Sequence, residues 1–296
     1  MTADGKADSV RIILCADDYA MTEGVSKSID ELATAGRLSA TSVIVTSRHW
    51  PTLGARARAL RGHIAVGLHI NLTLGSPLGA MPGFAPSGRF SGVGDVAARA
   101  LRGDIERAEI AVEVLRQIDA FAAVCGHPPD FIDGHQHVHA LPGIRHGVLD
   151  ALAARPQVRP PLIRDPADSL AAILQRGTAV TKAMALWWLA RGFGDAARRG
   201  GYPVNESFAG VSDFGPSETS RDFERAAIGR GPMHLVMCHP GYVDDELAEV
   251  DPVTERRRVE HDLLMGGRHF GARLWRPQRD VSGPPVDWRA IRASTP

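Results

Sequence analysis

The sequence predicts a single-domain α/β fold, a closed or nearly closed (β/α) barrel of the TIM type with mainly parallel strands. Three observations lead to this prediction. Short aliphatic segments that end in polar residues alternate with segments of helical periodicity. The length of 296 residues suits one barrel of about 250 residues with extensions. No repeat, linker or compositional break divides the chain, so we expect one domain over residues 1–296.

The N-terminal part predicts a β-α-β unit. Val10–Cys15 is mostly aliphatic and runs into Asp17 and Asp18, as expected of a buried parallel strand with polar groups at its C-terminal end. Thr22 suits a helix N-cap, and apolar residues at helical spacing follow it. Thr41–Val45 is the second expected strand.

The same alternation continues along the chain. The further expected strands are Ile64–Thr73, Phe131–His135, Val158–Arg164, Met233–Cys238 and Ala272–Trp275. The clearest expected helices are Ile105–Cys125 and Glu255–Leu264, with a mainly helical region at 165–201. A long loop at 75–94, rich in Gly, Pro and Ser, leaves the strand that carries His69. We expect this loop to cover the site and to offer Met81, Phe84 and Phe90 to a substrate.

Composition excludes several classes of protein. Lys plus Arg equals Asp plus Glu, 34 against 34, and no dense basic run occurs, which argues against nucleic-acid binding. Cys15, Cys125 and Cys238 are too few and too far apart for a disulfide framework. The sequence shows neither a signal-peptide pattern nor an apolar segment of bilayer length, so we expect a cytoplasmic protein without membrane insertion.

Polar residues follow several of the expected strands. They are Asp17, Asp18, His69, Asp133, His135, His137, His139, Arg164 and His239. Since parallel strands bring their carboxyl ends to one rim of a barrel, we expect these side chains to meet there. Asp and His together are typical ligands of a divalent metal ion. Consecutive strand residues point to opposite faces, so only one carboxylate of the Asp17–Asp18 pair would meet an ion.

The segment Asp133–His139 carries the sharpest local pattern. In an extended strand, residues two apart share a face, so Asp133, His135, His137 and His139 would face one cavity. One ion does not accept three histidines from one strand, so some of them would contact the substrate or orient a ligand. By contrast, Arg256–Arg258 is interpreted as a solvated helix face.

Four motifs, Ala16–Tyr19, Val66–Thr73, Asp133–His139 and Met237–Tyr242, resemble those of the YdjC-like carbohydrate deacetylases, which include chitooligosaccharide and hopanoid-associated deacetylases. The motifs follow the family's order, and the resemblance spans about 11–275, which we take as the core. It implies a distorted (β/α) barrel and a hydrolase that removes the acetyl group from an N-acetylated sugar, breaking a linear amide C–N bond with one divalent metal ion.

The resemblance also assigns roles to residues. The implied metal ligands are Asp18, His69 and His135. Asp17 corresponds to the general base, and His239 lies near the scissile amide, where it would protonate the leaving amine. The residues expected to contact the substrate or to orient the ligands are Asp133, His137, His139, Arg164 and Tyr242. Ala20 stands where the family usually has glycine, which costs about 1 kcal/mol if that position needs a positive φ.

Several alternatives stay open. The resemblance favours Mg²⁺, whereas two imidazoles and a carboxylate suit Zn²⁺ or Mn²⁺. A metal-dependent phosphoesterase or amidohydrolase on a similar barrel would favour two metal ions, and a non-catalytic metal- or sugar-binding protein would bind without turnover. The sequence leaves the sugar, the acetyl group that is removed and a homodimeric state open.

Overall fold

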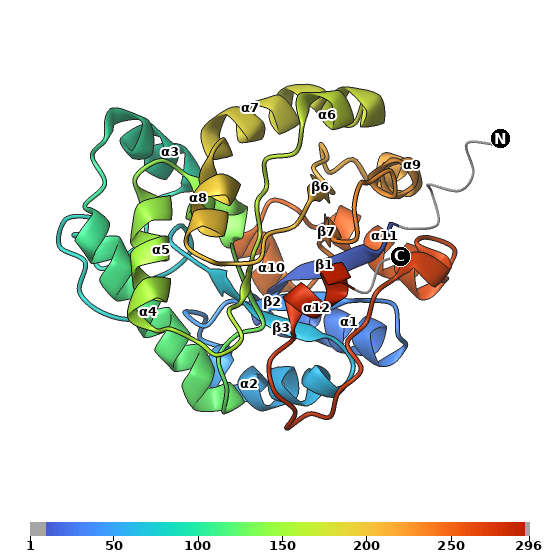
Figure 1. Ribbon diagram of the computed structural model, residues 1–296, viewed down its shortest axis with the longest axis horizontal. Helices are drawn as coiled ribbons and strands as arrows, with labels where there is room; N and C mark the ends of the chain where they lie inside the picture. Colours follow the sequence, from blue (N-terminus) through green and yellow to red (C-terminus); the bar gives the residue numbers. More distant parts are fainter. Residues whose placement is uncertain (1–9, 294–296) are drawn as a thin grey trace.

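A parallel sheet of seven strands, in the order β5-β4-β3-β2-β1-β7-β6, lies at the centre of the computed structural model, which describes residues 10–293. The strands are β1 Ile12–Tyr19, β2 Ala40–Val43, β3 Ala65–Ile70, β4 Phe131–Gly134, β5 Leu162–Ile163, β6 Ser207–Ala209 and β7 His234–Cys238. The sheet curls, and helices flank it on the outside (Figure 1). This confirms the predicted barrel-like α/β class.

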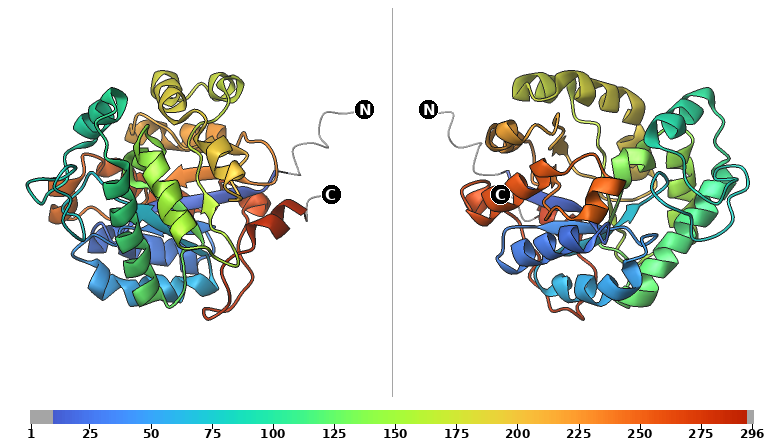
Figure 2. Two further views of the ribbon diagram at one scale, coloured as in Figure 1. Left: turned by 60° about the vertical axis from the view of Figure 1, so that its left-hand side comes forward. Right: turned by 180° about the vertical axis from the view of Figure 1, so that it is seen from behind.

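Twelve α-helices are described within residues 10–293. They are α1 Glu23–Thr34, α2 Trp50–Ala59, α3 Val93–Arg102, α4 Arg107–Cys125, α5 Ile144–Ala154, α6 Leu170–Arg176, α7 Val180–Ala190, α8 Phe193–Arg199, α9 Thr219–Ala226, α10 Asp245–Val250, α11 Glu255–Met265 and α12 Trp288–Ala293. In both views of Figure 2, α6 and α7 (olive) lie at the periphery of the molecule. Among the helices of the described residues, none combines the length and apolar character that crossing a membrane requires.

The start of α1 follows the sequence prediction. The Thr22 hydroxyl oxygen accepts a hydrogen bond from the Val25 backbone N–H at 3.2 Å, as an N-cap does. This cap begins α1 directly after the acids of β1. The predicted β-α-β unit at the N-terminus is therefore confirmed.

The sheet is nearly closed at a seam between β5 and β6. Ile163 and Val204 form a single parallel bridge there. The Asn205 side chain then accepts a hydrogen bond from the Asp165 N–H at 2.7 Å and donates one to the Asp165 carbonyl at 2.9 Å. This buried amide replaces a longer strand ladder and fixes the chain next to Arg164.

Two predicted strands differ in the structure. Val158–Arg164 shortens to the two residues of β5 because Pro160 and Pro161 have no N–H to donate to a ladder. Ala272–Trp275 is not a strand: it contains the end of a 3₁₀ helix, η5 Gly271–Arg273, and makes one bridge to β1 through Leu274. The sequence prediction also missed β6.

The C-terminal segment closes the end of the barrel at which the strands begin. Trp288 and Val286 pack into a buried apolar cluster with residues of the sheet, among them Phe131. The indole N–H of Trp288 donates to the Asp130 carbonyl at 2.6 Å, and the Asp130 carboxylate accepts from the N–H groups of Val66 and Val286. The opposite end, where the strands finish, stays free for a site.

Candidate active site

Both acids at the end of β1 line one cavity. Asp17 and Asp18 are buried, and the φ angles of Asp18 and Ala20 are +71° and +70°. The left-handed residue at Asp18 interrupts the alternation of the strand, and the β1–β2 register shifts at the same place. The two carboxylates therefore line one cavity instead of facing opposite sides, although only Asp18 belongs with His69 and His135 to the group that could hold a metal ion. Ala20 has the positive φ at which alanine costs about 1 kcal/mol relative to glycine.

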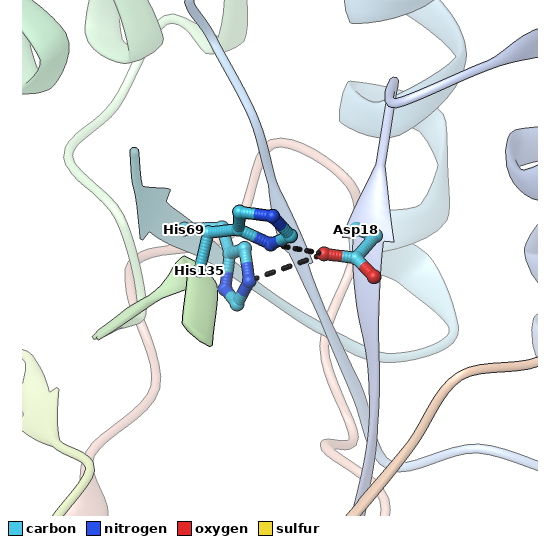
Figure 3. Close-up of side chains that lie close together, drawn as sticks. All are labelled: Asp18, His69 and His135. Atoms are coloured by element: carbon cyan, nitrogen blue, oxygen red, sulfur yellow. Dashed lines mark hydrogen bonds and ion pairs between the residues drawn. The ribbon is translucent and has the colours of Figure 1, made fainter. Parts of the chain in front are cut away.

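Asp18, His69 and His135 bring three donor atoms together at the floor of this cavity. Asp18 Oδ1 lies 3.3 Å from His69 Nε2 and 3.0 Å from His135 Nδ1, and Figure 3 shows both imidazoles directed at that oxygen. Ligand atoms about 2.1 Å from one ion are separated from each other by roughly 3.0–3.4 Å. The spacing and donor types therefore fit a divalent metal ion, and the three residues form a group that could hold one.

Asp133 orients His69. The Nδ1–H of His69 donates to Asp133 Oδ1 at 2.7 Å, and Ser42 Oγ lies 3.0 Å from the same nitrogen. This leaves Nε2 to face Asp18, an arrangement typical of histidines that bind metal. Burial lowers the pKa of His69, but the neighbouring acids, first Asp133, outweigh burial and raise the pKa to about 10. A cation at Nε2 would therefore displace a proton.

Arg164 holds Asp17. Its guanidinium donates to Asp17 Oδ2 at 2.6 Å and to Oδ1 at 2.7 Å, and it lies 2.5 Å from Asp133 Oδ2. Burial alone would raise the pKa of Asp17, but Arg164 holds it well below the usual range. Cys15, Asp17 and Asp133 form a second group with the spacing of metal ligands. The positive charge of Arg164 already satisfies both acids of that group.

The histidine-rich segment does not continue β4. It forms a 3₁₀ turn, η3 His135–Ala140, with Gln136 and His137 at φ +53° and +60°. His135 and His137 line the cavity, whereas His139 is buried and donates through Nε2–H to the Arg164 carbonyl at 2.9 Å. The prediction that three histidines face one cavity is wrong because the left-handed turn changes the direction of the chain. His139 supports the site from behind.

His239 and Tyr242, which follow β7, point to different places. His239 lines the cavity; its backbone N–H donates to Glu260 Oε2 at 2.6 Å, and its ring packs edge-on against Phe214. Tyr242 packs between α1 and α11, where its hydroxyl donates to Glu31. The structure therefore brings His239, but not Tyr242, to the cavity.

Sequence reasoning missed Arg257. Arg256 and Arg257 are buried, so the solvated face predicted for Arg256–Arg258 is wrong for its first two residues. Arg257 Nη2 donates to Asp18 Oδ2 and to Asp251 Oδ2, both at 2.7 Å. Burial alone would raise the pKa of Asp18, but Arg257 and the two histidines hold it well below the usual range. Asp18 and Arg257 are 239 positions apart, and no local pattern in α11 marks this contact.

The cavity has a volume of about 490 Å³, within the usual range of small-molecule sites. Its floor is polar, with the metal-ligand candidates beside Asp17, His137 and His239. Its walls are mainly apolar, and they include Leu186 and Leu189 of α7. A ligand here would contact charged groups at one end and hydrocarbon along its sides.

The long loop at 75–94 contributes less to the lining of the cavity than the sequence predicts. Met81 and Phe84 are each only 2% exposed, and Phe84 packs edge-on against Phe90 with ring centroids 6.2 Å apart. The prediction that Met81 and Phe84 offer apolar surface to a sugar is therefore wrong, because both pack into the core. Val93, the first residue of α3, is the contact of this region with the cavity.

Comparisons with known proteins agree with this arrangement. A family model described as YdjC-like protein matches residues 11–270. A chitooligosaccharide deacetylase of Klebsiella pneumoniae is 30% identical over 239 residues, which cover 79% of this chain and 82% of that protein. A human carbohydrate deacetylase is 28% identical over 257 residues, covering 79% and 75%.

Among solved structures, one from Enterococcus faecalis shares the fold. It is provisionally named as a cellobiose-phosphate cleavage protein, and it aligns with a TM-score of 0.62 over 86% of this chain and 90% of that one. The sequences are 20% identical. This likeness supports the barrel-like architecture described above.

Proposed function

Since the chain belongs to the YdjC-like protein family, we propose that it is a metal-dependent hydrolase that removes the acetyl group from an N-acetylated sugar or oligosaccharide. The observation that carries the proposal is the convergence of Asp18, His69 and His135 on one point, beside an ionised Asp17 and His239. The relatives named carbohydrate deacetylase and chitooligosaccharide deacetylase support the substrate class.

Asp18, His69 and His135 would hold one divalent ion. When bound, such an ion polarises a carbonyl group and acidifies water at neutral pH. The two imidazoles and one carboxylate suit Zn²⁺ or Mn²⁺, and family resemblance also suggests Mg²⁺. The apolar walls of the cavity would exclude bulk water and hold the hydrocarbon face of a sugar ring.

Asp17 is proposed as the general base. Arg164 fixes both of its oxygens and keeps it ionised, so Asp17 can accept a proton from water at neutral pH. Its low pKa makes the protonated carboxyl short-lived. The proton must therefore pass on, and it would replace the proton that a separate acid gives to the leaving amine.

His239 is proposed to protonate that amine. An amide C–N bond breaks only when the nitrogen leaves as a neutral amine, so an acid must stand near it. His239 lines the same cavity as Asp17, and Glu260 fixes its backbone. His137 lines the cavity as well, and we assign it to substrate contact.

The experiment is acetate release from a panel of N-acetylated mono- and oligosaccharides. We expect release that is lost after chelator treatment and restored by adding back Zn²⁺, Mn²⁺ or Mg²⁺. Activity that survives complete metal removal contradicts the metal-dependent mechanism. No release from any member of a broad panel contradicts the deacetylase.

The count of metal ions tests the phosphoesterase alternative. Two-metal hydrolases hold a second ion about 3.5–4 Å from the first and need further acidic ligands for it, and here Asp17 and Asp133 are paired with Arg164. We therefore expect one equivalent of metal per chain. Two equivalents, together with phosphate-ester hydrolysis, would favour the alternative.

A further inference from the structure

The two oxygens of Asp18 have different partners. Oδ1 faces the two imidazoles, and Oδ2 accepts a hydrogen bond from Arg257 Nη2 at 2.7 Å. A carboxylate without such a donor can bind a cation through one oxygen or through both. In this site one oxygen is already occupied.

Arg257 does not depend on Asp18 for its position. Its Nε donates to the Val253 carbonyl at 3.0 Å, and Nη2 also donates to Asp251 at 2.7 Å. The side chain is 1% exposed. A guanidinium fixed at two other points presents a rigid donor to Asp18.

We propose that Arg257 is a positioning residue that restricts Asp18 to a single metal-binding oxygen and thereby sets the cation affinity of the site. This inference rests on the metal site of the proposed function. With Oδ2 occupied, Asp18, His69 and His135 would each offer one ligand atom to a divalent ion, which would leave room for water and the substrate. The guanidinium charge also opposes that of the cation, so the site binds less tightly than its ligands alone would allow.

The inference predicts an unusual combination of effects. Replacing Arg257 by methionine frees Oδ2 and removes a positive charge, so a divalent ion should bind more tightly. The same change should lower kcat, because a second oxygen of Asp18 fills a position that the substrate needs. A residue with only a structural role would loosen the site when replaced.

The experiment measures the Kd for Co²⁺ by competition with a chromophoric chelator, together with the visible absorption of the bound ion. For Arg257→Met we expect binding about tenfold tighter than wild type and weaker absorption bands, as coordination number increases. Arg257→Lys, which keeps the charge, should stay close to the wild-type Kd. Asp251→Asn removes the second carboxylate that Arg257 Nη2 contacts, so the guanidinium charge acts more fully on Asp18 and Co²⁺ should bind more weakly than in wild type.

Arg176→Met is the matched control. Arg176 is also buried and pairs with Asp168, neither of which lies near the three ligands, so its loss should lower Tm without changing the Kd or the spectrum. Unchanged or weaker Co²⁺ binding in Arg257→Met overturns the inference. If that variant does not fold, wild-type or tighter Co²⁺ binding in Asp251→Asn overturns it. A wild-type protein that binds no Co²⁺ instead contradicts the metal site of the proposed function.

Discussion

Asp17 and Asp18 are neighbours in the chain, but their carboxylates have separate partners. Asp17 is held by Arg164, and Asp18 by Arg257 and the imidazoles of the candidate metal site. The left-handed backbone at Asp18 allows both side chains to reach one cavity while keeping their environments distinct. Two adjacent acids can therefore serve as a ligand and as a base, and their replacement should have different effects.

We expect Asp18→Ala to lose metal and activity together, because three ligands leave little redundancy. Asp17→Asn keeps the size of the side chain and one acceptor for Arg164 but cannot take a proton. It should retain metal while kcat falls by about 10²–10⁴. Metal analysis and steady-state kinetics on both variants check this. A metal-free Asp17→Asn beside a metal-loaded Asp18→Ala would reverse the two roles.

At the residue scale, sequence patterns could identify the groups but not their pairing. Asp17, Asp18, His69, His135 and His239 were expected at the carboxyl ends of strands, and all five line the cavity. The interaction of Asp18 with Arg257 could not be predicted from the sequence, because it depends on how α11 packs against the end of β1. The positive φ angles at Asp18 and Ala20 could not be predicted from the sequence either.

At the scale of elements, the seam between β5 and β6 depends on one side chain. The Asn205 amide makes both hydrogen bonds to the backbone of Asp165 and a third to the Ser207 carbonyl. The sequence predicted the long strands through their aliphatic runs. It could not predict β6, because this strand has only three residues, Ser207–Ala209, which pair with β7 and contain no aliphatic run.

Asn205→Ala should lower the free energy of unfolding by about 2–3 kcal/mol, since it removes three buried hydrogen bonds and leaves the Asp165 N–H unpaired. Denaturant unfolding measures the effect. Thr34→Ala is the control: its hydroxyl donates to the Asp30 carbonyl at an exposed position, and its loss should change stability by less than about 0.5 kcal/mol. Equal effects of the two changes would show that the amide does not hold the seam.

His234, the first residue of β7, makes stability depend on pH. Burial lowers its pKa from 6.5 to about 4, so between these values the unfolded chain binds a proton that the folded protein does not. Stability contributed by neutral His234 is complete above pH 6.5 and is lost as the pH falls toward 4. The slope is at most about 1.4 kcal/mol per pH unit.

His234→Gln should remove this part of the pH dependence, because glutamine does not titrate. Urea unfolding at several values between pH 7.5 and 4.5 compares the variant with wild type. The difference in unfolding free energy should shrink as the pH decreases. A difference that stays constant over this range would mean that His234 is not kept neutral by the fold.

At the scale of the whole molecule, the two ends of the barrel differ in structure and in their expected role. The end where the strands begin is closed by the C-terminal segment, and the end where they finish carries the cavity. The alternation of strands and helices predicted the barrel, and the motifs predicted the end that carries the site. The closure was not predictable, since Trp288 contacts Asp130 across 158 positions of the chain and nothing in the local sequence marks it.

Because the two ends of the barrel are distinct, we predict that a substitution at the closed end lowers stability without changing catalysis. Trp288 is 2% exposed and packs against Phe131 and Trp275, so Trp288→Ala should lower the free energy of unfolding by about 3–5 kcal/mol. Trp188→Ala is the matched control. Because Trp188 on α7 is 48% exposed, this change should lower the free energy of unfolding far less.

Metal stoichiometry and kcat, measured well below Tm, should stay at wild-type values in Trp288→Ala, because the indole lies at the opposite end from the three ligands. Thermal unfolding, metal analysis and acetate release on the same preparations check each part. If Trp288→Ala loses its metal while still folded, the closed end is coupled to the site through the strands. The barrel would then act as one cooperative support for the metal ligands rather than as two independent ends.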